Sequence, residues 1–362
     1  MIGFRFSEYR PDDAQSVFDR LFKIFQELML YTSGDVVESL AWLTELDKEY
    51  KLTTEEYGMG DFIRDLEEKG FIRRDGDGEG GVGPTAKLEI SLRQKSLDDI
   101  FGDLKKAKSG RHTTGFIGNG DEFTSDVKPF EFGDTLENLA VTNSLRNAYI
   151  NHGIDEFKLT QDDLEMYETY YQSQMSSVLM IDISHSMILY GEDRITPAKK
   201  VALALAEFIQ TRFPKDTLDL IVFGNDAWPI ELKDVPYLQV GPYHTNTVAG
   251  LELAMDILKR RRNPNKQIFM ITDGKPTCLK IGKNYYKNSF GLDRKIVNRC
   301  LNLAMHCKKL NIPITTFMIA RDPYLVRFVE AFTKTNNGKA FYSSLQGLGS
   351  FVLENYKKRG RK

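Results

Sequence analysis

The second half of the chain carries a series of short, mainly apolar segments, and this pattern constrains the fold more than any other feature. The segments lie at 177–181, 218–223, 267–272 and 313–319, with stretches of helical period between them. A strand that is mainly apolar at both odd and even positions is buried on both faces, as in a parallel sheet covered by helices. We therefore predict an α/β domain over residues 175–362, built on a doubly wound, mainly parallel sheet.

Local signals place helices between these strands. Thr196 suits the N-cap position and Pro197 the first helical position, so a helix is expected from there to Phe213. In a doubly wound sheet, ligands bind beyond the carboxyl ends of the strands, near the point where the strand order reverses. The other elements expected in this half are an edge strand at 228–232, helices at 248–259, 294–310, 324–333 and 348–356, and a last strand at 339–342.

The first half has a different pattern and is expected to form a smaller, mostly helical domain. At 362 residues the chain is too long for one ordinary core, so two domains are expected. We assign residues 1–108 to the helical N-terminal domain and residues 109–174 to a long connection with a helix. The helices predicted in this half start from an apolar stripe at 18–29 and continue at 35–46, 60–68, 96–105 and 135–151.

The overall composition argues against several classes of protein. The net charge of −2 gives no support for nucleic-acid binding by the whole chain. Cys278, Cys300 and Cys307 have no short metal-ligand spacing, so we expect reduced thiols. The chain start lacks the apolar segment of a secretory signal, and no apolar run approaches the roughly 18 residues of a membrane span. We therefore expect a cytoplasmic protein without a membrane span.

Two motifs in the first half imitate known sites. Residues 75–80 resemble the opening of an EF-hand calcium loop, but the acid expected at its twelfth position is Ala86, and Pro84 lies inside the loop. An acidic turn is the better interpretation. A helix at 60–71, a glycine-rich turn and the segment 87–92 match a winged-helix element, but no basic recognition face accompanies them. Neither motif supports a function.

Oxygen-bearing side chains gather at the ends of two of the predicted strands. Asp182, Ser184 and Ser186 follow the first strand, and Asp273 follows the strand at 267–272, with Thr245 in a loop between them. These are hard oxygen ligands, which suit Mg²⁺ in octahedral geometry. Hydroxyls and distant carboxylates cannot fill six positions alone, so a coordination position is left open for a carboxylate from another molecule. The pattern therefore indicates a binding site rather than a reaction centre.

This set resembles the metal-ion-dependent adhesion site (MIDAS) of von Willebrand factor A (vWA) domains. The resemblance covers about residues 175–350 in element order as well as motif. The segments 197–202, 271–277 and 317–324 also look like bacterial cytosolic proteins encoded beside MoxR-type AAA+ ATPases, related to CoxE and to the vWA subunit of magnesium chelatase. A weaker likeness to that group extends to residues 128–134.

The resemblance implies a role for each residue of the site. Ser184 and Ser186 would bind Mg²⁺ directly, and Thr245 would do so when a ligand is engaged. Asp182 and Asp273 would act mostly through water. Thr247 is the alternative to Thr245, but the family pattern uses the first threonine of such a pair. Mn²⁺ and Ca²⁺ are the alternative metals.

Further residues are candidates for contact with a partner. His185 is expected to pack or to support the site from behind, since Mg²⁺ prefers oxygen ligands. The loop 275–291 is long, basic and aromatic, and it must lie around the site. It would steer an acidic peptide toward the metal, and the alternative is an ordinary solvated loop. The candidate partner-binding residues are His244, Lys275, Lys283, Tyr285, Tyr286 and Lys287.

Enzymatic activity is not expected. The chain lacks a Gly-x-Ser-x-Gly elbow, a Gly-x-x-x-x-Gly-Lys phosphate loop and a Gly-x-Gly-x-x-Gly turn after a strand. The resemblance instead implies a Mg²⁺-dependent protein-binding module, an adaptor or substrate-recognition partner of a MoxR-type AAA+ ATPase. One alternative is a structural scaffold whose metal only stabilises the fold. A minor alternative is an Mg²⁺-dependent phosphoryl-transfer enzyme using Asp182.

Overall fold

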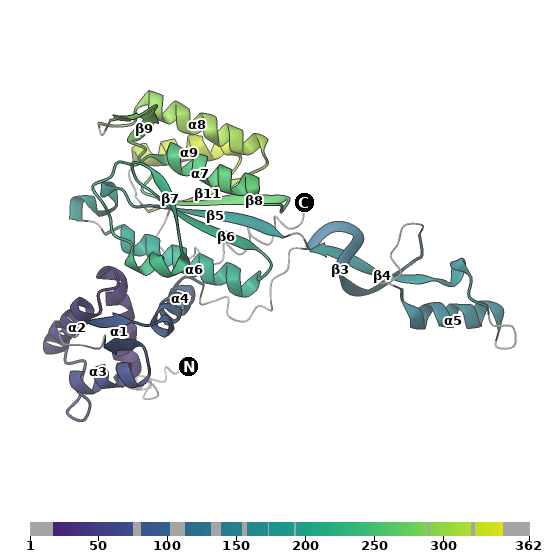
Figure 1. Ribbon diagram of the computed structural model, residues 1–362, viewed down its shortest axis with the longest axis horizontal. Coiled ribbons are helices and arrows are strands. Elements are labelled where there is room, and N and C mark those ends of the chain that lie inside the picture. The colour runs from purple at the N-terminus through teal and green to yellow at the C-terminus, as the bar shows by residue number, and fades with distance from the viewer. Residues whose placement is uncertain are drawn as a thin grey trace, which may run out of the picture.

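The computed structural model comprises an α/β domain, a helical domain packed against it, and a projecting arm (Figure 1). It describes residues 17–74, 81–101, 113–131, 139–153, 158–172, 174–191, 193–288, 290–319 and 323–342. Within these ranges, no helix is both long enough and apolar enough to cross a bilayer. The helix predicted at 348–356 lies outside them.

A six-stranded sheet forms the centre of the α/β domain, in the order β12-β11-β8-β5-β6-β7. Every neighbouring pair is parallel except β6 and β7, which are antiparallel. The α/β, mainly parallel fold predicted from the buried strands is therefore confirmed. The strands are β5 Met175–Asp182, β6 Thr217–Phe223, β7 Ala227–Ile230, β8 Asn265–Thr272, β11 Ile314–Met318 and β12 Lys339–Tyr342.

Helices cover both faces of this sheet, as the continuously buried strands require. Leu179 and Ile181 of β5 pack with the core under α6, whereas Val178 and Met180 pack with the opposite core. This alternation is the two-residue period of a strand buried on both sides. Helix α6 Ile195–Arg212 lies on one face, and the other is covered by α7 Thr247–Arg260, α8 Arg294–Lys309 and α9 Pro323–Asn336 (Figure 1).

The start of α6 differs slightly from the sequence-based expectation. The helix begins at Ile195, one residue before the predicted cap. The Asp193 carboxylate accepts a hydrogen bond from the Thr196 backbone N–H over 3.0 Å, so the aspartate supplies the oxygen that Thr196 was expected to supply. Arg194 therefore lies at the N-cap position, with its side chain outside the helix.

The helical domain is built around an aromatic core that includes Phe18, Phe25 and Phe62. Residues 87–92 do not form the strand of a winged-helix element, because they belong to a helix that begins at Ala86. This helix also contains the start of the segment predicted at 96–105. The elements are α1 Val17–Tyr31, α2 Val36–Tyr50, α3 Met59–Glu68, the antiparallel pair β1 Ile72–Arg74 and β2 Val82–Pro84, and α4 Ala86–Phe101.

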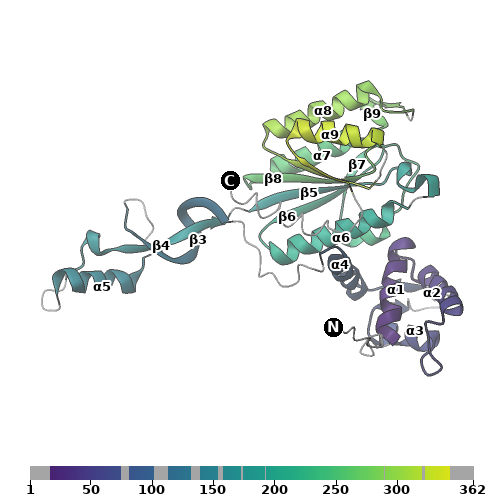
Figure 2. The same ribbon diagram turned by 180° about the vertical axis from the view of Figure 1, so that it is seen from behind.

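The helical domain packs against α6 through α1 and α4 (Figures 1 and 2). The contact includes a buried cation, because the Lys199 ammonium of α6 donates to the Leu30 carbonyl over 3.1 Å and to the Ser33 hydroxyl over 2.9 Å. Leu30 lies in the last turn of α1, where carbonyl groups lack helical partners. Glu27 of α1 forms an ion pair with Lys200 of α6 across the same interface and a second ion pair with Lys95 of α4 within the helical domain.

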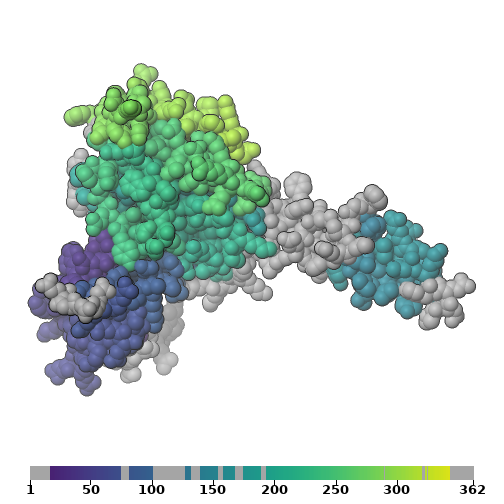
Figure 3. Space-filling model, in the orientation of Figure 1, coloured from purple at the N-terminus to yellow at the C-terminus, as the bar shows by residue number. Residues whose placement is uncertain are grey.

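The described part of residues 109–174 contains a helix, as predicted for this connection, and also two strands that were not predicted. Strands β3 Thr113–Pro129 and β4 Glu165–Gln172 form an antiparallel pair, with α5 Val141–His152 and the short helix η3 Gln161–Asp163 between them. The register shifts at several points along β3. The glycine-rich, polar sequence has no two-residue period that would have indicated this strand. The part containing α5 stands away from the α/β domain (Figure 3).

Candidate functional site

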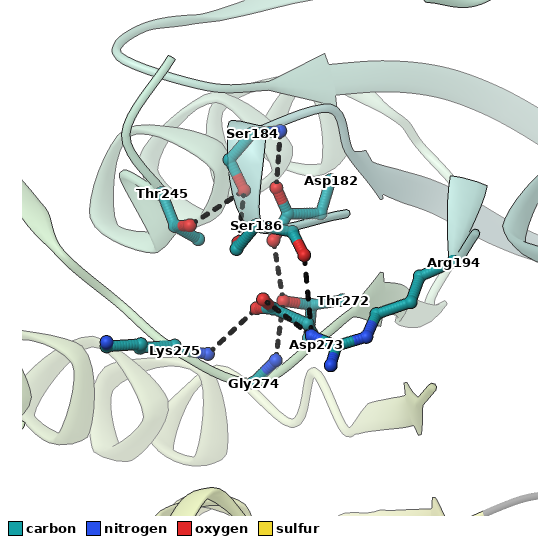
Figure 4. A network of polar contacts seen from close by, with 9 residues as sticks. All are labelled: Asp182, Ser184, Ser186, Arg194, Thr245, Thr272, Asp273, Gly274 and Lys275. Atoms are coloured by element: carbon teal, nitrogen blue, oxygen red, sulfur yellow. Dashed lines mark hydrogen bonds and ion pairs between the residues drawn. The ribbon is translucent and has the colours of Figure 1, made fainter. Parts of the chain in front are cut away.

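The candidate site lies at the carboxyl ends of β5 and β8, which are neighbours at the centre of the sheet. Ile181 pairs with Ile271 in the parallel register, so the residues that follow them emerge side by side. Asp182 ends β5 and Asp273 directly follows β8, and both side chains are buried. Figure 4 shows these two carboxylates with the hydroxyl groups around them.

Neutral groups of the chain hold both oxygens of the Asp182 carboxylate. Oδ1 accepts from the Ser184 backbone N–H over 2.9 Å, and Oδ2 accepts from the Thr272 hydroxyl over 2.7 Å. The Thr272 hydroxyl in turn accepts from the Gly274 N–H over 3.0 Å. Thr272 was missed as a site residue, although its place one residue before Asp273 at the strand end was a usable signal.

Three hydroxyl groups form a continuous row in front of the carboxylates. The Ser184 and Ser186 hydroxyl oxygens are 3.0 Å apart, and the Thr245 hydroxyl donates to that of Ser184 over 2.8 Å. Thr247 is instead the first residue of α7, whose N-cap is Asn246. The structure thus brings together the five residues predicted for the site, with Thr245 rather than Thr247 contacting Ser184.

A cation that the sequence reasoning missed also reaches the site. The Arg194 guanidinium Nη1 lies 3.6 Å from Asp273 Oδ2 and donates to the Ser186 carbonyl over 3.4 Å (Figure 4). The arginine side chain is only 15% exposed. Its position just before a helix, twelve residues after Asp182 in the chain, carries no pattern that would have identified it.

Burial and mutual repulsion dominate the electrostatics of the two acids. Burial raises the pKa of Asp182, and the negative charge of Asp273 raises it further. Burial also raises the pKa of Asp273, against the hydrogen bonds from Ser186 and from the Lys275 backbone and the charge of Arg194. The ionised pair is therefore costly in this place, and a further cation would relieve the cost.

The two predicted histidines have different surroundings. His185 is exposed at the start of the short helix η4 His185–Gly191, so it does not pack in the core as one of the two expectations had it. His244 is partly buried, and its backbone N–H donates to the Asn225 side chain over 2.8 Å. Burial lowers the pKa of His244, and the positive charge of Lys287 lowers it further.

The loop 275–291 contains a β-hairpin rather than only irregular structure. Its strands are β9 Cys278–Ile281 and β10 Asn284–Lys287. Thr277 fastens the base of the hairpin to the site, because its N–H donates to the Thr245 carbonyl over 2.9 Å and its hydroxyl accepts from the Thr245 N–H over 3.0 Å. The hairpin therefore lies directly beside the row of hydroxyls.

The candidate partner-binding residues on this segment are not equally placed. The hydroxyls of Tyr285 and Tyr286 donate to Asp226 and Asp293, so both tyrosines are held by carboxylates of the chain itself. The side chain of Lys275 points away from the two site carboxylates, while its backbone N–H donates to Asp273 (Figure 4). Lys283 lies at the exposed tip of the hairpin.

The sheet order, the helices on both faces and the Asp182–Asp273 pair at the strand ends define a vWA-type α/β protein. The family model for the vWA domain of Rv0959-like proteins matches residues 176–357, and the model for the third domain of the same proteins matches residues 122–169. The chain belongs to the Rv0959-like family.

The chain is also similar to curated relatives and to solved structures. The Mycobacterium tuberculosis protein Rv0959 is 29% identical over 307 residues, which are 82% of this chain and 45% of the relative. The chain therefore spans about half the length of the curated relatives it matches. The vWF domain of the type V pili tip protein Mfa5 from Porphyromonas gingivalis (13% identity, TM-score 0.42) aligns over 52% of this chain and 97% of its own. The SpRpn10 VWA domain (19%, 0.36) aligns over 50% and 95%.

Proposed function

We propose that the chain is a Mg²⁺-dependent protein-binding module. The observation that carries the proposal is the row of three hydroxyls beside two buried carboxylates. In an octahedral Mg²⁺ site with oxygens about 2.0–2.1 Å from the ion, neighbouring ligands are about 2.8–3.0 Å apart. The Ser184–Ser186 and Ser184–Thr245 oxygen distances of 3.0 and 2.8 Å match this spacing.

The donor set also fits the charge of a divalent cation. Ser184, Ser186 and Thr245 would hold the ion through their hydroxyls, and Asp182 and Asp273 would balance its charge. In the described part of the chain, no three His, Cys, Asp or Glu side chains are grouped for metal binding, so any metal here depends on hydroxyl ligands. Such a weakly anionic set is suited to Mg²⁺, with Mn²⁺ as the close alternative. The bound ion would supply an electrophilic position for an outside carboxylate.

The surroundings favour an acidic protein segment as the ligand. The hairpin β9–β10 stands next to Thr245 and carries Lys283 at its tip and Lys287 near His244. Phe290, just beyond the hairpin, is 93% exposed. A basic edge with exposed apolar surface beside the site would attract and hold an acidic partner.

We propose an adaptor or substrate-recognition role beside a MoxR-type AAA+ ATPase, in the cytoplasm and without enzymatic activity. The identity of this partner is drawn from the sequence resemblance. A scaffold role for the metal is the second candidate, because burial of Asp182 and Asp273 gives a bound cation a direct effect on stability.

A pull-down tests the proposal and separates the two roles. Tagged full-length chain is incubated with native lysate in Mg²⁺ and in EDTA, and Asp182→Ala is compared with wild type in parallel with thermal unfolding. The control is Asp219→Ala, which removes a surface ion pair with Arg261 away from the site. Capture of an AAA+ ATPase only by wild type and control in Mg²⁺, at similar stability, supports the adaptor. Capture that is the same in EDTA and with Asp182→Ala refutes metal-dependent docking. A loss of thermal stability without a loss of capture supports the scaffold role.

A further inference from the structure

We infer that Arg194 sets the charge of the proposed metal site: it balances Asp273 while no metal is bound and keeps the site positively charged once the metal is bound. In this role it weakens metal binding and strengthens the attraction of the metal-loaded site for an outside carboxylate. The inference rests on the proposed function, and it concerns a residue that the ligand set does not include.

The first argument is the position of the guanidinium. Arg194 Nη1 lies 3.6 Å from Asp273 Oδ2 and 3.4 Å from the Ser186 carbonyl oxygen, so it touches two of the segments that form the site. Both partners of the ion pair are shielded, since the arginine side chain is 15% exposed and that of Asp273 is 2% exposed. A shielded charge pair interacts more strongly than one in open solvent.

The second argument is the contrast between the two acids. Asp182 accepts only neutral donors among its hydrogen bonds in the structure, from Ser184 and Thr272. In the described part of the chain, Arg194 forms an ion pair with Asp273 and none with Asp182, although the two acids lie at the ends of neighbouring strands. The arginine is therefore placed on the Asp273 side of the site, where it offsets one of the two negative charges.

The third argument is a count of charges. With both acids ionised, the two carboxylates and Arg194 sum to −1. A divalent cation brings the total to +1, so an incoming carboxylate makes the site neutral. Without the arginine, the loaded site would already be neutral in this count and would attract an incoming carboxylate less strongly. The arginine therefore favours ligation by an anionic partner over ligation by water.

The backbone of Arg194 does not need its side chain for support. Its N–H donates to the Met187 carbonyl over 2.9 Å, and its carbonyl accepts from the Ala198 N–H over 3.2 Å. The loop that leads into α6 is therefore fixed by main-chain bonds, and the side chain can be exchanged with the fold kept. This makes a substitution at residue 194 a usable test.

The test measures Mn²⁺ binding from the electron paramagnetic resonance signal of the free ion, with Mg²⁺ as competitor, together with thermal unfolding in EDTA. Arg194→Met keeps the apolar stem and removes the charge, Arg194→Lys keeps the charge, and Arg261→Met removes a surface arginine that pairs with Asp219. We expect Arg194→Met to bind Mn²⁺ at least about tenfold more tightly than wild type while unfolding at a lower temperature in EDTA. Arg194→Lys and Arg261→Met should bind within about threefold of wild type.

The opposite signs of the two effects identify the role. A merely structural arginine would, when replaced, lower both the stability and the metal affinity. Equal or weaker Mn²⁺ binding by Arg194→Met, with wild type binding normally, overturns the inference and leaves the proposed function standing. Failure of wild type to bind Mn²⁺ or Mg²⁺ overturns the proposed metal site itself, and the inference with it.

Discussion

The hydroxyl of Thr245 donates to that of Ser184 over 2.8 Å, although the two residues are 61 positions apart in the chain. Thr277 also holds the backbone of Thr245. The Thr245 N–H donates to the Thr277 hydroxyl, and the Thr245 carbonyl accepts from the Thr277 N–H. The fold therefore fixes a hydroxyl from the loop before α7 against one from the loop after β5. Because the hairpin β9–β10 begins directly after Thr277, the site and its basic edge are one connected unit.

This relationship predicts that Thr245 is required for metal binding and nearly dispensable for folding. Thr245→Val keeps the shape and removes the hydroxyl, at a stability cost of about 1 kcal/mol for the lost hydrogen bond. Titration calorimetry should show at least about tenfold weaker Mg²⁺ binding. The matched control is Thr247→Val in the first turn of α7, which should bind Mg²⁺ like wild type. Equal loss in both variants would contradict the assignment of Thr245.

The buried acid pair predicts that the Asp182 carboxylate lowers folding stability without metal and is required for metal binding. Asp182→Asn removes one of two charges that burial and repulsion make costly, while the amide keeps a similar shape. In EDTA, this variant should be more stable than wild type, by on the order of 1–3 kcal/mol in chemical unfolding. Added Mg²⁺ should then raise the melting temperature of wild type but not that of the variant. A variant less stable than wild type in EDTA would show that the carboxylate is needed for folding itself.

Lys199 predicts a pH dependence at the interface between the helical domain and α6. Burial lowers the pKa of Lys199 from 10.5 to about 8, against the attraction of Asp193. The unfolded chain therefore keeps this proton up to about pH 10.5, whereas the folded chain releases it near pH 8. Folding stability should consequently rise as the pH increases through this window, by up to about 3 kcal/mol.

Urea unfolding of wild type and Lys199→Met at intervals from pH 7 to 10 measures this effect. The difference between the two proteins isolates the contribution of Lys199 from other groups that titrate in the same range. Lys199→Met should lack the rise. The same dependence of folding stability on pH in both proteins would show that burial does not lower the pKa of Lys199.

The surroundings of Gly34 show how closely the helical domain packs against the α/β domain. Its φ of 86° is left-handed, and a Cβ built on it would lie 2.1 Å from the Tyr237 ring of the α/β domain. Gly34→Ala should destabilise the protein by more than about 2 kcal/mol, through the strained backbone and the displaced ring. Gly70→Ala is the control, since its φ is 70° but nothing lies within 4 Å of the added carbon, so only the backbone strain of about 1 kcal/mol remains. Similar melting temperatures for both variants would refute the close contact between Gly34 and the Tyr237 ring.

The basic hairpin predicts the salt dependence of partner binding. Lys283→Glu combined with Lys287→Glu should weaken capture of the partner by about tenfold at low salt and reduce the effect of added salt. Lys280→Glu is the comparison with the same change of charge at one position. The Lys280 ammonium pairs with the Asp226 carboxylate over 2.8 Å, so a loss of affinity in this variant comes mainly from breaking that internal ion pair. Unchanged affinity in the double variant would remove the hairpin from the interface.

The sequence was most informative where one physical requirement dominated. Strands buried on both faces, such as Met175–Asp182, are mainly apolar on both faces, and this pattern predicted both the sheet and the acids at its edge. The hairpin was missed because all residues of β10 are exposed and its strands are only four residues long. Arg194 was missed because its role arises from a tertiary contact with Asp273, and nothing local in the sequence marks such a pair.

Calorimetric titration of Mg²⁺ into the full-length chain, wild type against Ser184→Ala combined with Ser186→Ala, tests the central claim most directly. The row of hydroxyls predicts a single Mg²⁺ site in wild type and its loss in the double variant, with circular dichroism confirming that both proteins are folded. Equal Mg²⁺ binding by the two proteins, or none by wild type, would contradict a metal site at the carboxyl ends of β5 and β8.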